Sequence, residues 1–187
     1  MSARADVTAL PGPKLLFFAT VSFAALLPAA IARADLAARV VAVHDGDTLT
    51  VVAERRRVRV RLAEIDAPEL GQPFGKRAKK ALADLCFGKL AAIEIRGRDR
   101  YDRAVARVKC DGRDANAEQV RLGYAWVYTR YAAWNSPLYA LEVDAKASGR
   151  GIWSLSDPVP PWRWRQRGLA RRLDATDPRK RQVQKMD

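Results

Sequence analysis

Histidine and cysteine are scarce in this chain of 187 residues, which contains one histidine, His44, and two cysteines, Cys86 and Cys110. A structural zinc site usually needs four nitrogen or sulfur ligands. So few suitable side chains argue against a zinc protein. Because His44 stands alone, we expect it to be structural or solvated.

Acidic residues are also in the minority. The chain has 21 Asp and Glu against 34 Lys and Arg, which gives a net charge of +13 at pH 7. A basic excess of this size favours polyanionic partners such as nucleic acid or anionic lipid. It can also serve solubility alone. The charge therefore narrows the choice of partners and leaves the fold open.

A long apolar run occurs at the N-terminus, over residues 15–31, and polar residues interrupt it. Basic residues precede the run, and alanines at positions 32 and 34 follow it. This pattern predicts a signal peptide over residues 1–34 and export to the periplasm or the medium. An uncleaved leader that acts as an N-terminal anchor is the alternative.

Export changes the interpretation of the two cysteines. In an oxidising compartment Cys86 and Cys110 have one available pairing, which makes a disulfide possible. Two small buried side chains that stay reduced are the alternative. The sequence leaves both open.

Strand patterns dominate the first part of the chain. Residues 38–53 are rich in Val, Thr and Leu and contain an Asp-Gly-Asp turn, which predicts two strands. After a second turn, apolar residues alternate with arginine over residues 57–62, so one face of this strand is buried and the other is basic. Pro68 ends it. Residues 90–95 and 104–109 predict a hairpin with a charged loop.

Three helices are expected between and after these strands. Apolar residues at spacings of four, four and three predict an amphipathic helix over residues 73–87. Asn116 and Gln119 resemble a capping box at the start of a short second helix. A Ser-Pro start at position 136 predicts a third, which ends at Gly149.

This order of elements predicts an α+β, mainly β domain over residues 35–157: a five-stranded OB-type Greek-key barrel with about three packed helices. Residues 158–187 are rich in Trp, Pro and Arg and show little periodicity, which predicts a docked segment followed by a disordered basic tail. We expect the five tryptophans to serve in the core and in docking: Trp126, Trp134, Trp153, Trp162 and Trp164.

Carboxylates occur in two turns that flank the basic strand. Asp47 lies in the first turn and Asp66 in the second. Oxygen ligands suit hard cations, so both are predicted metal ligands. Ordinary Asx-turn bonding is the alternative for the first turn. Arg61 and Asp66 differ in strand parity, so the strand must bend or end between them if both are to reach one site.

Three short segments carry a resemblance. The sequences DGDT at 45–48, RLAEIDAPE at 61–69 and DRYDR at 99–103 resemble, in order and spacing, the signature segments of the staphylococcal-nuclease-like family. The resemblance covers about residues 36–155.

The resemblance implies a calcium site, a general base, two phosphate-binding arginines and a nucleotide-binding group. The implied residues are Asp47, Asp66 and the backbone carbonyl of Ala67 for the ion, Glu69 as the base, Arg61 and Arg103 as the arginines, and Arg100, Tyr101 and Tyr131 near the nucleotide. Asp102 stands where the family's type enzyme has glycine, which puts a carboxylate in a position to compete for Arg103.

These residues predict a calcium-dependent endonuclease that hydrolyses DNA, with RNA as a further substrate. Its sequence preference should be low because the expected contacts read phosphates. The alternative is a noncatalytic OB-fold nucleic-acid-binding protein of the cell envelope. We expect a monomer, no protein partner is implied, and membrane contact arises only if the leader is uncleaved.

Overall fold

The computed structural model describes residues 36–176, with side chains as far as residue 169. The predicted leader over residues 1–34 and the end of the predicted tail, residues 177–187, lie outside the described residues and stay predictions. Within the described part, no helix is both long and apolar enough to cross a membrane.

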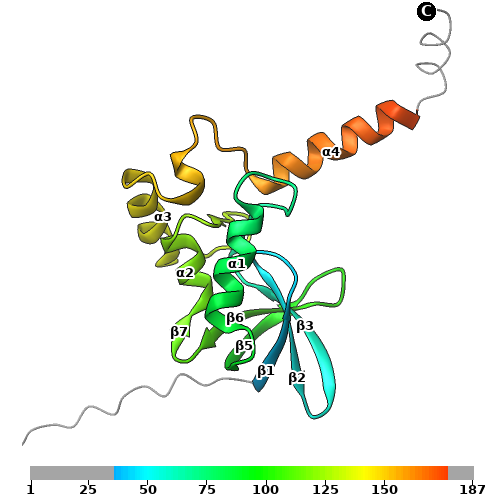
Figure 1. Cartoon of the computed structure of the whole chain (residues 1–187), viewed down its shortest axis with the longest axis vertical. Helices are drawn as coiled ribbons and strands as arrows, with labels where there is room; N and C mark the ends of the chain where they lie inside the picture. The colour runs from blue at the N-terminus through cyan, green and yellow to red at the C-terminus, as the bar shows by residue number, and fades with distance from the viewer. Residues whose placement is uncertain (1–35, 177–187) are drawn as a thin grey trace, which may run out of the picture. The chain divides into compact units, whose positions relative to one another are not determined.

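Five strands form a closed barrel (Figure 1). They are β1 (Leu36–Val43), β2 (Thr48–Ala53), β3 (Arg56–Leu62), β5 (Leu90–Arg98) and β6 (Ala104–Cys110). Neighbouring strands in the order β3-β2-β1-β5-β6 are antiparallel, and a parallel pairing of β3 with β6 closes the barrel. The predicted five-stranded OB-type barrel is confirmed.

Three short strands complete the β-structure. The strand β7 (Arg113–Asp114) extends the barrel sheet beside β6, while β4 (Ile65–Asp66) and β8 (Trp126–Val127) form a separate antiparallel pair. This pair holds Asp66 opposite Trp126. It therefore fixes the backbone of one of the predicted site residues.

Four α-helices and one 3-10 helix occur among the described residues. They are α1 (Gly75–Cys86), α2 (Ala115–Arg121), α3 (Leu138–Ala147), η1 (Gly151–Ser154) and α4 (Pro161–Thr176). The first three confirm the predicted helices. In α1 the predicted stripe is buried at Ala78, Leu82 and Leu85, which packs this helix on the barrel core.

The capping prediction for α2 was wrong in its residues. Asp114 is the N-cap, and its carboxylate accepts a hydrogen bond from the Ala117 amide. Asn116 is instead buried, and its side-chain amide donates to the Ala63 and Ala106 carbonyls. The short polar side chain at this position thus ties α2 to the barrel.

The helix α4 was not predicted. Residues 161–176 show little apolar periodicity, so the sequence reads there as a tail. Pro161 occupies the first helical position, where its missing N–H costs nothing. The Pro160 carbonyl accepts hydrogen bonds from the Arg163 and Trp164 amides. Tertiary contacts at the start of the helix, rather than an apolar stripe, anchor it.

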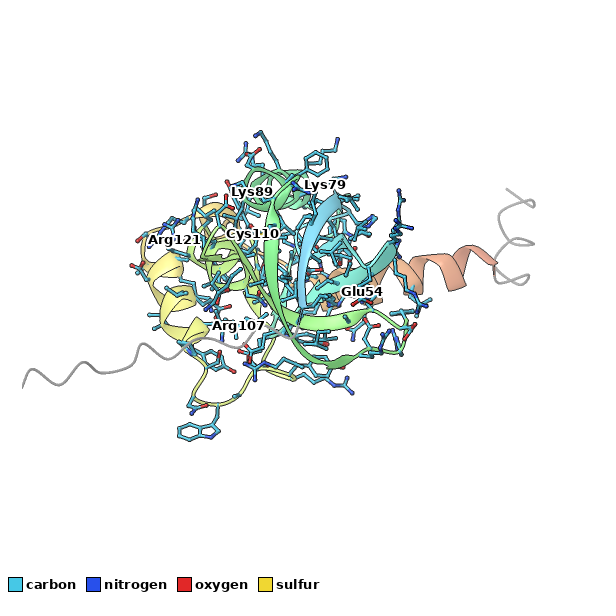
Figure 2. All side chains as sticks on the ribbon, turned by 90° about the horizontal axis from the view of Figure 1, so that it is seen from below. Glu54, Lys79, Lys89, Arg107, Cys110 and Arg121 are labelled. Carbon is cyan, nitrogen blue, oxygen red and sulfur yellow. A yellow bond between two sulfur atoms is a disulfide. The ribbon has the colours of Figure 1, made fainter. Side chains whose placement is uncertain are left out.

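The disulfide between Cys86 and Cys110 joins the end of α1 to the end of β6, with Cα atoms 5.3 Å apart. Both cysteines are fully buried, and Figure 2 labels Cys110 at its strand. The bond closes a sequence separation of 24 residues. Cross-links of this kind stabilise a fold mainly by restricting the unfolded chain.

The tryptophans fall into two groups. Trp126 makes edge-on contacts with Trp153 and Trp162, at centroid distances of 5.4 and 6.5 Å. For Trp134 the prediction of a core or docking role was wrong, because its side chain is 90% exposed. Trp164 is 36% exposed.

Basic side chains are spread around the barrel. Figure 2 labels Lys79 on α1, Arg107 on β6 and Arg121 on α2, which point to different sides of the view. On β3, Arg57 and Arg59 are exposed while the residues that alternate with them face inward. The excess charge is therefore not confined to one site.

Candidate active site

The Asp45-Gly46-Asp47 turn between β1 and β2 is held against two helices. Asp45 accepts a hydrogen bond from the Asp47 amide at 3.0 Å, which is the expected Asx-turn bond. The Gln119 side chain on α2 donates to the Gly46 carbonyl. A Cβ at Gly46 would lie 2.6 Å from the Cβ of Ala78, so only glycine fits there. Asp45 thus makes the Asx-turn bond, and the Asp47 carboxylate points into the site instead.

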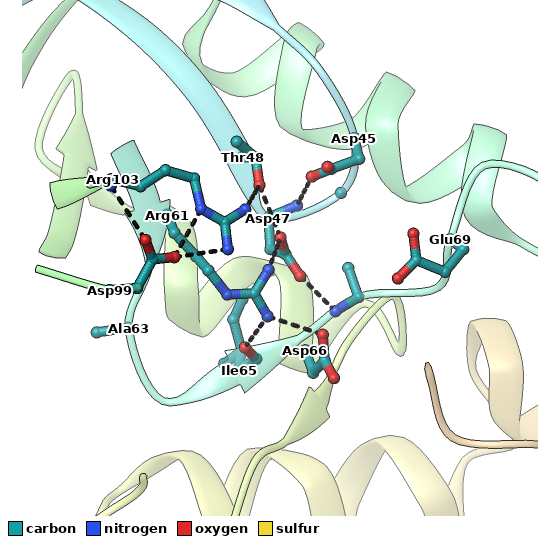
Figure 3. Close-up of polar contacts among 12 residues, drawn as sticks. Asp45, Asp47, Thr48, Arg61, Ala63, Ile65, Asp66, Glu69, Asp99 and Arg103 are labelled. Atoms are coloured by element: carbon teal, nitrogen blue, oxygen red, sulfur yellow. Dashed lines mark hydrogen bonds and ion pairs between the residues drawn. The ribbon is translucent and has the colours of Figure 1, made fainter. Parts of the chain in front are cut away.

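Arg61 bridges the two predicted metal ligands (Figure 3). Its Nη1 donates to Asp47 Oδ1 at 2.6 Å, and its Nη2 donates to Asp66 Oδ1 at 2.8 Å. The strand β3 ends at Leu62, and Glu64 has a φ of 64°, which turns the chain before β4 begins. The predicted break between Arg61 and Asp66 is confirmed, and both side chains reach one place.

The acidic pair is almost completely buried. Asp47 and Asp66 side chains are 3% and 1% exposed. Burial raises the pKa of Asp47 to about 7; Arg61 lowers it, while the charges of Asp45 and Asp66 raise it. The Arg61 guanidinium therefore does not fully compensate the burial of the Asp47 carboxylate. An additional cation at this place would be stabilised.

Ala67 lies directly beside this pair. Its backbone amide donates to Asp47 Oδ2 at 2.7 Å. Among the described residues, no group of three or more His, Cys, Asp and Glu side chains is arranged to hold a metal. A cation here would thus use two carboxylates, and the remaining ligands would be backbone oxygens or water. Such an all-oxygen set fits a hard cation.

Glu69 follows on the loop after Pro68, and its side chain is 40% exposed. Its backbone position is fixed, because its carbonyl accepts a hydrogen bond from the Gln72 amide at 2.8 Å. Gly75 packs directly on the same carbonyl, since an added Cβ would lie 1.9 Å from that oxygen. The start of α1 therefore sets the position of Glu69.

The variant Gly75→Ala should lower the free energy of unfolding by about 1–3 kcal/mol, because the new methyl group forces the Glu69 carbonyl to move. Urea unfolding of the whole chain measures this. Gly71→Ala is the matched control, since an added Cβ there meets no atom within 4 Å. Equal stabilities of the two variants would contradict the close packing.

Arg103 lies at the same mouth but pairs with a residue that the sequence did not single out. Its Nε and Nη2 contact Asp99 Oδ2 at 2.7 and 2.6 Å, and its Nη1 lies 3.5 Å from Thr48 Oγ1. Burial raises the pKa of Asp99, but hydrogen bonds from Arg103 outweigh it and hold the pKa below its usual value. Asp102 pairs instead with Arg98 at 2.7 Å, because its φ of 59° turns the loop at this point.

The residues expected near the nucleotide are exposed. The Tyr101 ring is 65% exposed, with Arg100 and Arg103 guanidinium carbons 4.8 and 5.4 Å from its centroid. Tyr131 is 66% exposed and packs edge-on against Tyr128 at 5.1 Å. Tyr101 therefore adjoins Arg103 directly, while Tyr131 is positioned through Tyr128.

The sequence did not indicate Arg165, which comes from α4. Its guanidinium contacts the carboxylates of Asp66 and Glu69. With this residue, the site contains acidic groups and three arginines at one mouth of the barrel. The fold and the site together define a class of protein: an OB-type barrel with acidic side chains and arginines gathered at one mouth.

The comparison with known proteins names the family. Residues 59–155 match the family described as staphylococcal nuclease homologue, and the chain belongs to this family. The match ends before α4 begins. The resemblance that the three motifs carry is thereby confirmed.

Several relatives are similar over most of their length. A protein of Escherichia coli O157:H7 named "Uncharacterized endonuclease" is 44% identical over 135 residues, which are 72% of this chain and 88% of the relative. A protein of Haemophilus influenzae with the same name is 42% identical over 130 residues, 68% of this chain and 72% of the relative. The "Micrococcal nuclease" of Shigella flexneri is 38% identical over 143 residues, 71% of this chain and 82% of the relative.

Proposed function

We propose that this protein is a calcium-dependent endonuclease that hydrolyses phosphodiester bonds of DNA and RNA with little sequence preference. The nuclease assignment is supported by family membership and by relatives named endonuclease and micrococcal nuclease. The observation that carries it is the bridge from Arg61 to the buried Asp47 and Asp66, next to Glu69.

The arginines are suited to the charge of the substrate. A phosphodiester is anionic, so an attacking nucleophile approaches it only when that charge is masked. Arg61 and Arg103 present planar guanidinium groups, which match phosphate oxygens in a two-pronged geometry. Their carboxylate partners hold both groups at the mouth. We expect them to stabilise the additional negative charge that forms on the phosphate during hydrolysis.

The ligands proposed for Ca²⁺ are Asp47, Asp66 and the backbone carbonyl of Ala67. The burial of Asp47, which raises the pKa of its carboxyl to about 7, supports a cation at this position. When bound, the ion polarises a phosphate oxygen and positions a water molecule. The choice of Ca²⁺ is supported by the ligand atoms, which are all oxygens, because Ca²⁺ binds oxygen ligands.

Glu69 is the proposed general base. Its carboxylate is the more exposed one of the cluster, at 40% against 1% for Asp66. It can therefore reach a water molecule in the mouth and accept its proton as the water attacks in line. None of the proposed contacts reads a base edge, so sequence preference should be low.

The test uses the purified protein with single-stranded DNA, double-stranded DNA and RNA. With Ca²⁺ we expect the protein to cut these nucleic acids into shorter fragments. A chelator should stop the cleavage, and an excess of Ca²⁺ should restore it. Gel analysis of circular and end-blocked substrates shows whether cleavage is internal. Binding without cleavage in every divalent metal would instead support a noncatalytic nucleic-acid-binding protein.

A further inference from the structure

Arg165 on α4 contacts two of the carboxylates to which the proposed function gives a role. Its Nη2 donates to Asp66 Oδ2 at 2.7 Å, and its Nη1 donates to Glu69 Oε1 at 2.8 Å and to Asp66 Oδ1 at 3.2 Å. The residue lies ten positions beyond the end of the family match at 155. The contact is therefore a feature of the segment that follows the shared domain.

The helix is positioned for this contact by its first turn. Trp162 stacks on Tyr128 at 5.1 Å with an interplanar angle of 8°. The Gln72 side chain donates to the Val159 carbonyl, just before the helix. Trp162 and Arg165 are three residues apart, so they share one face of α4. Anchoring of Trp162 thus directs Arg165 to the site.

Arg165 and a cation would need the same oxygens. Both carboxylate oxygens of Asp66 accept hydrogen bonds from Arg165, and Arg61 takes a further position on Oδ1. The side chain of Glu69 is engaged as well. A cation bound to Asp66 must therefore replace at least one guanidinium contact, and Glu69 must leave Arg165 before it can accept a proton.

Arg165 is the arginine that can leave. Its side chain is 43% exposed, whereas that of Arg61 is 18% exposed and is held by two buried carboxylates. An exposed guanidinium regains its hydration when it swings away, which offsets part of the cost of leaving Asp66, and a cation bound there would offset the rest. Release from Asp66 and Glu69 needs a side-chain rotation and no change in the barrel.

We propose that Arg165 competes with the divalent cation for Asp66 and at the same time engages the proposed base Glu69, so that α4 sets the cation affinity of the site. This inference rests on the proposed function, since it assumes the cation site. It assigns Arg165 a regulatory contact: the guanidinium compensates the carboxylates while the cation is absent and moves into solvent when the cation binds.

The experiment compares Ca²⁺ binding by the full chain, by Arg165→Gln and by Arg167→Gln, using isothermal titration calorimetry. Arg167→Gln is the matched control, because Arg167 lies on the same helix and is exposed, and the substitution removes the same charge. We expect Arg165→Gln to bind Ca²⁺ at least about tenfold more tightly, as charged hydrogen bonds no longer compete. Arg167→Gln should stay within about twofold of the natural protein.

Thermal unfolding provides a second readout that does not depend on catalysis. Without Ca²⁺ the Tm of Arg165→Gln should be lower than that of the natural protein, because the carboxylates lose their partner. Added Ca²⁺ should raise the Tm of this variant by more than it raises the Tm of the natural protein. Arg165→Lys keeps the charge but loses the paired donors of the guanidinium. Its Tm without Ca²⁺ should therefore lie between those of the natural protein and Arg165→Gln.

The outcomes distinguish a failure of the Arg165 competition from a failure of the cation site that it assumes. Equal Ca²⁺ affinity in the natural protein and Arg165→Gln overturns the competition and leaves the cation site standing. Weaker binding by Arg165→Gln also overturns it, because Arg165 would then support the ion. Absence of binding in all of the proteins overturns the cation site and the competition together.

Discussion

Replacing Glu69 by glutamine should reduce kcat for DNA hydrolysis by about 10²- to 10⁴-fold, the range usual for loss of a general base. Glutamine keeps the size of the side chain and can still occupy the mouth, but its amide cannot accept a proton from water. Glu69 is not among the proposed cation ligands, and its side chain is partly exposed. Binding of Ca²⁺ and of uncleaved DNA should therefore persist. Single-turnover kinetics and a DNA-binding titration measure the two effects separately.

Glu64→Gln is the control for this substitution. Glu64 belongs to the same motif, but its carboxylate accepts a hydrogen bond from the Ser136 hydroxyl instead of facing the cluster. The carbonyl oxygen of glutamine can accept that bond equally, so the fold and kcat should be preserved. Full activity of Glu69→Gln would show that Glu69 is not the general base. Equal losses in both variants would indicate a disturbed loop instead.

The convergence of Arg61 and Asp66 could be predicted because it follows from local rules. Strand alternation places the two side chains on opposite faces unless the strand ends between them, and Pro68 indicates such an end. The structure ends β3 at Leu62 and turns at Glu64. The barrel was also predictable from local patterns, since residues 38–53 are rich in Val, Thr and Leu and apolar residues alternate with arginine over residues 57–62.

Arg165 and Asp99 could not be found in the same way. Arg165 lies 99 residues from Asp66 along the chain, and its helix has no apolar stripe that would predict it. Tertiary contacts before and at the start of the helix, between Gln72 and Val159 and between Trp162 and Tyr128, bring it to the mouth. The spacing of Asp99, four residues before Arg103, did indicate a pair. The sequence pattern instead predicted that Asp102, the direct neighbour of Arg103, would compete for it, but Asp102 pairs with Arg98.

Removal of the guanidinium in Arg61→Gln should have the largest effect on stability of any single change at the site. It leaves Asp47 and Asp66 buried without their shared partner, which should lower the free energy of unfolding in the absence of cation by about 3–5 kcal/mol. The hydrolysis rate should also fall by about 10²- to 10³-fold, because a donor to the phosphate is lost. Urea unfolding and steady-state kinetics measure the two quantities.

Added Ca²⁺ separates the two roles of Arg61. The ion can replace the positive charge between Asp47 and Asp66, so it should restore part of the stability of Arg61→Gln. It cannot supply the hydrogen bonds that a planar guanidinium gives to phosphate, so the hydrolysis rate should stay low. Arg59→Gln is the control, because Arg59 lies two residues earlier on the same face of β3 and is exposed; it should change stability by less than about 0.5 kcal/mol. Recovery of both stability and rate with Ca²⁺ would show that Arg61 only compensates the aspartates and does not act on the phosphate.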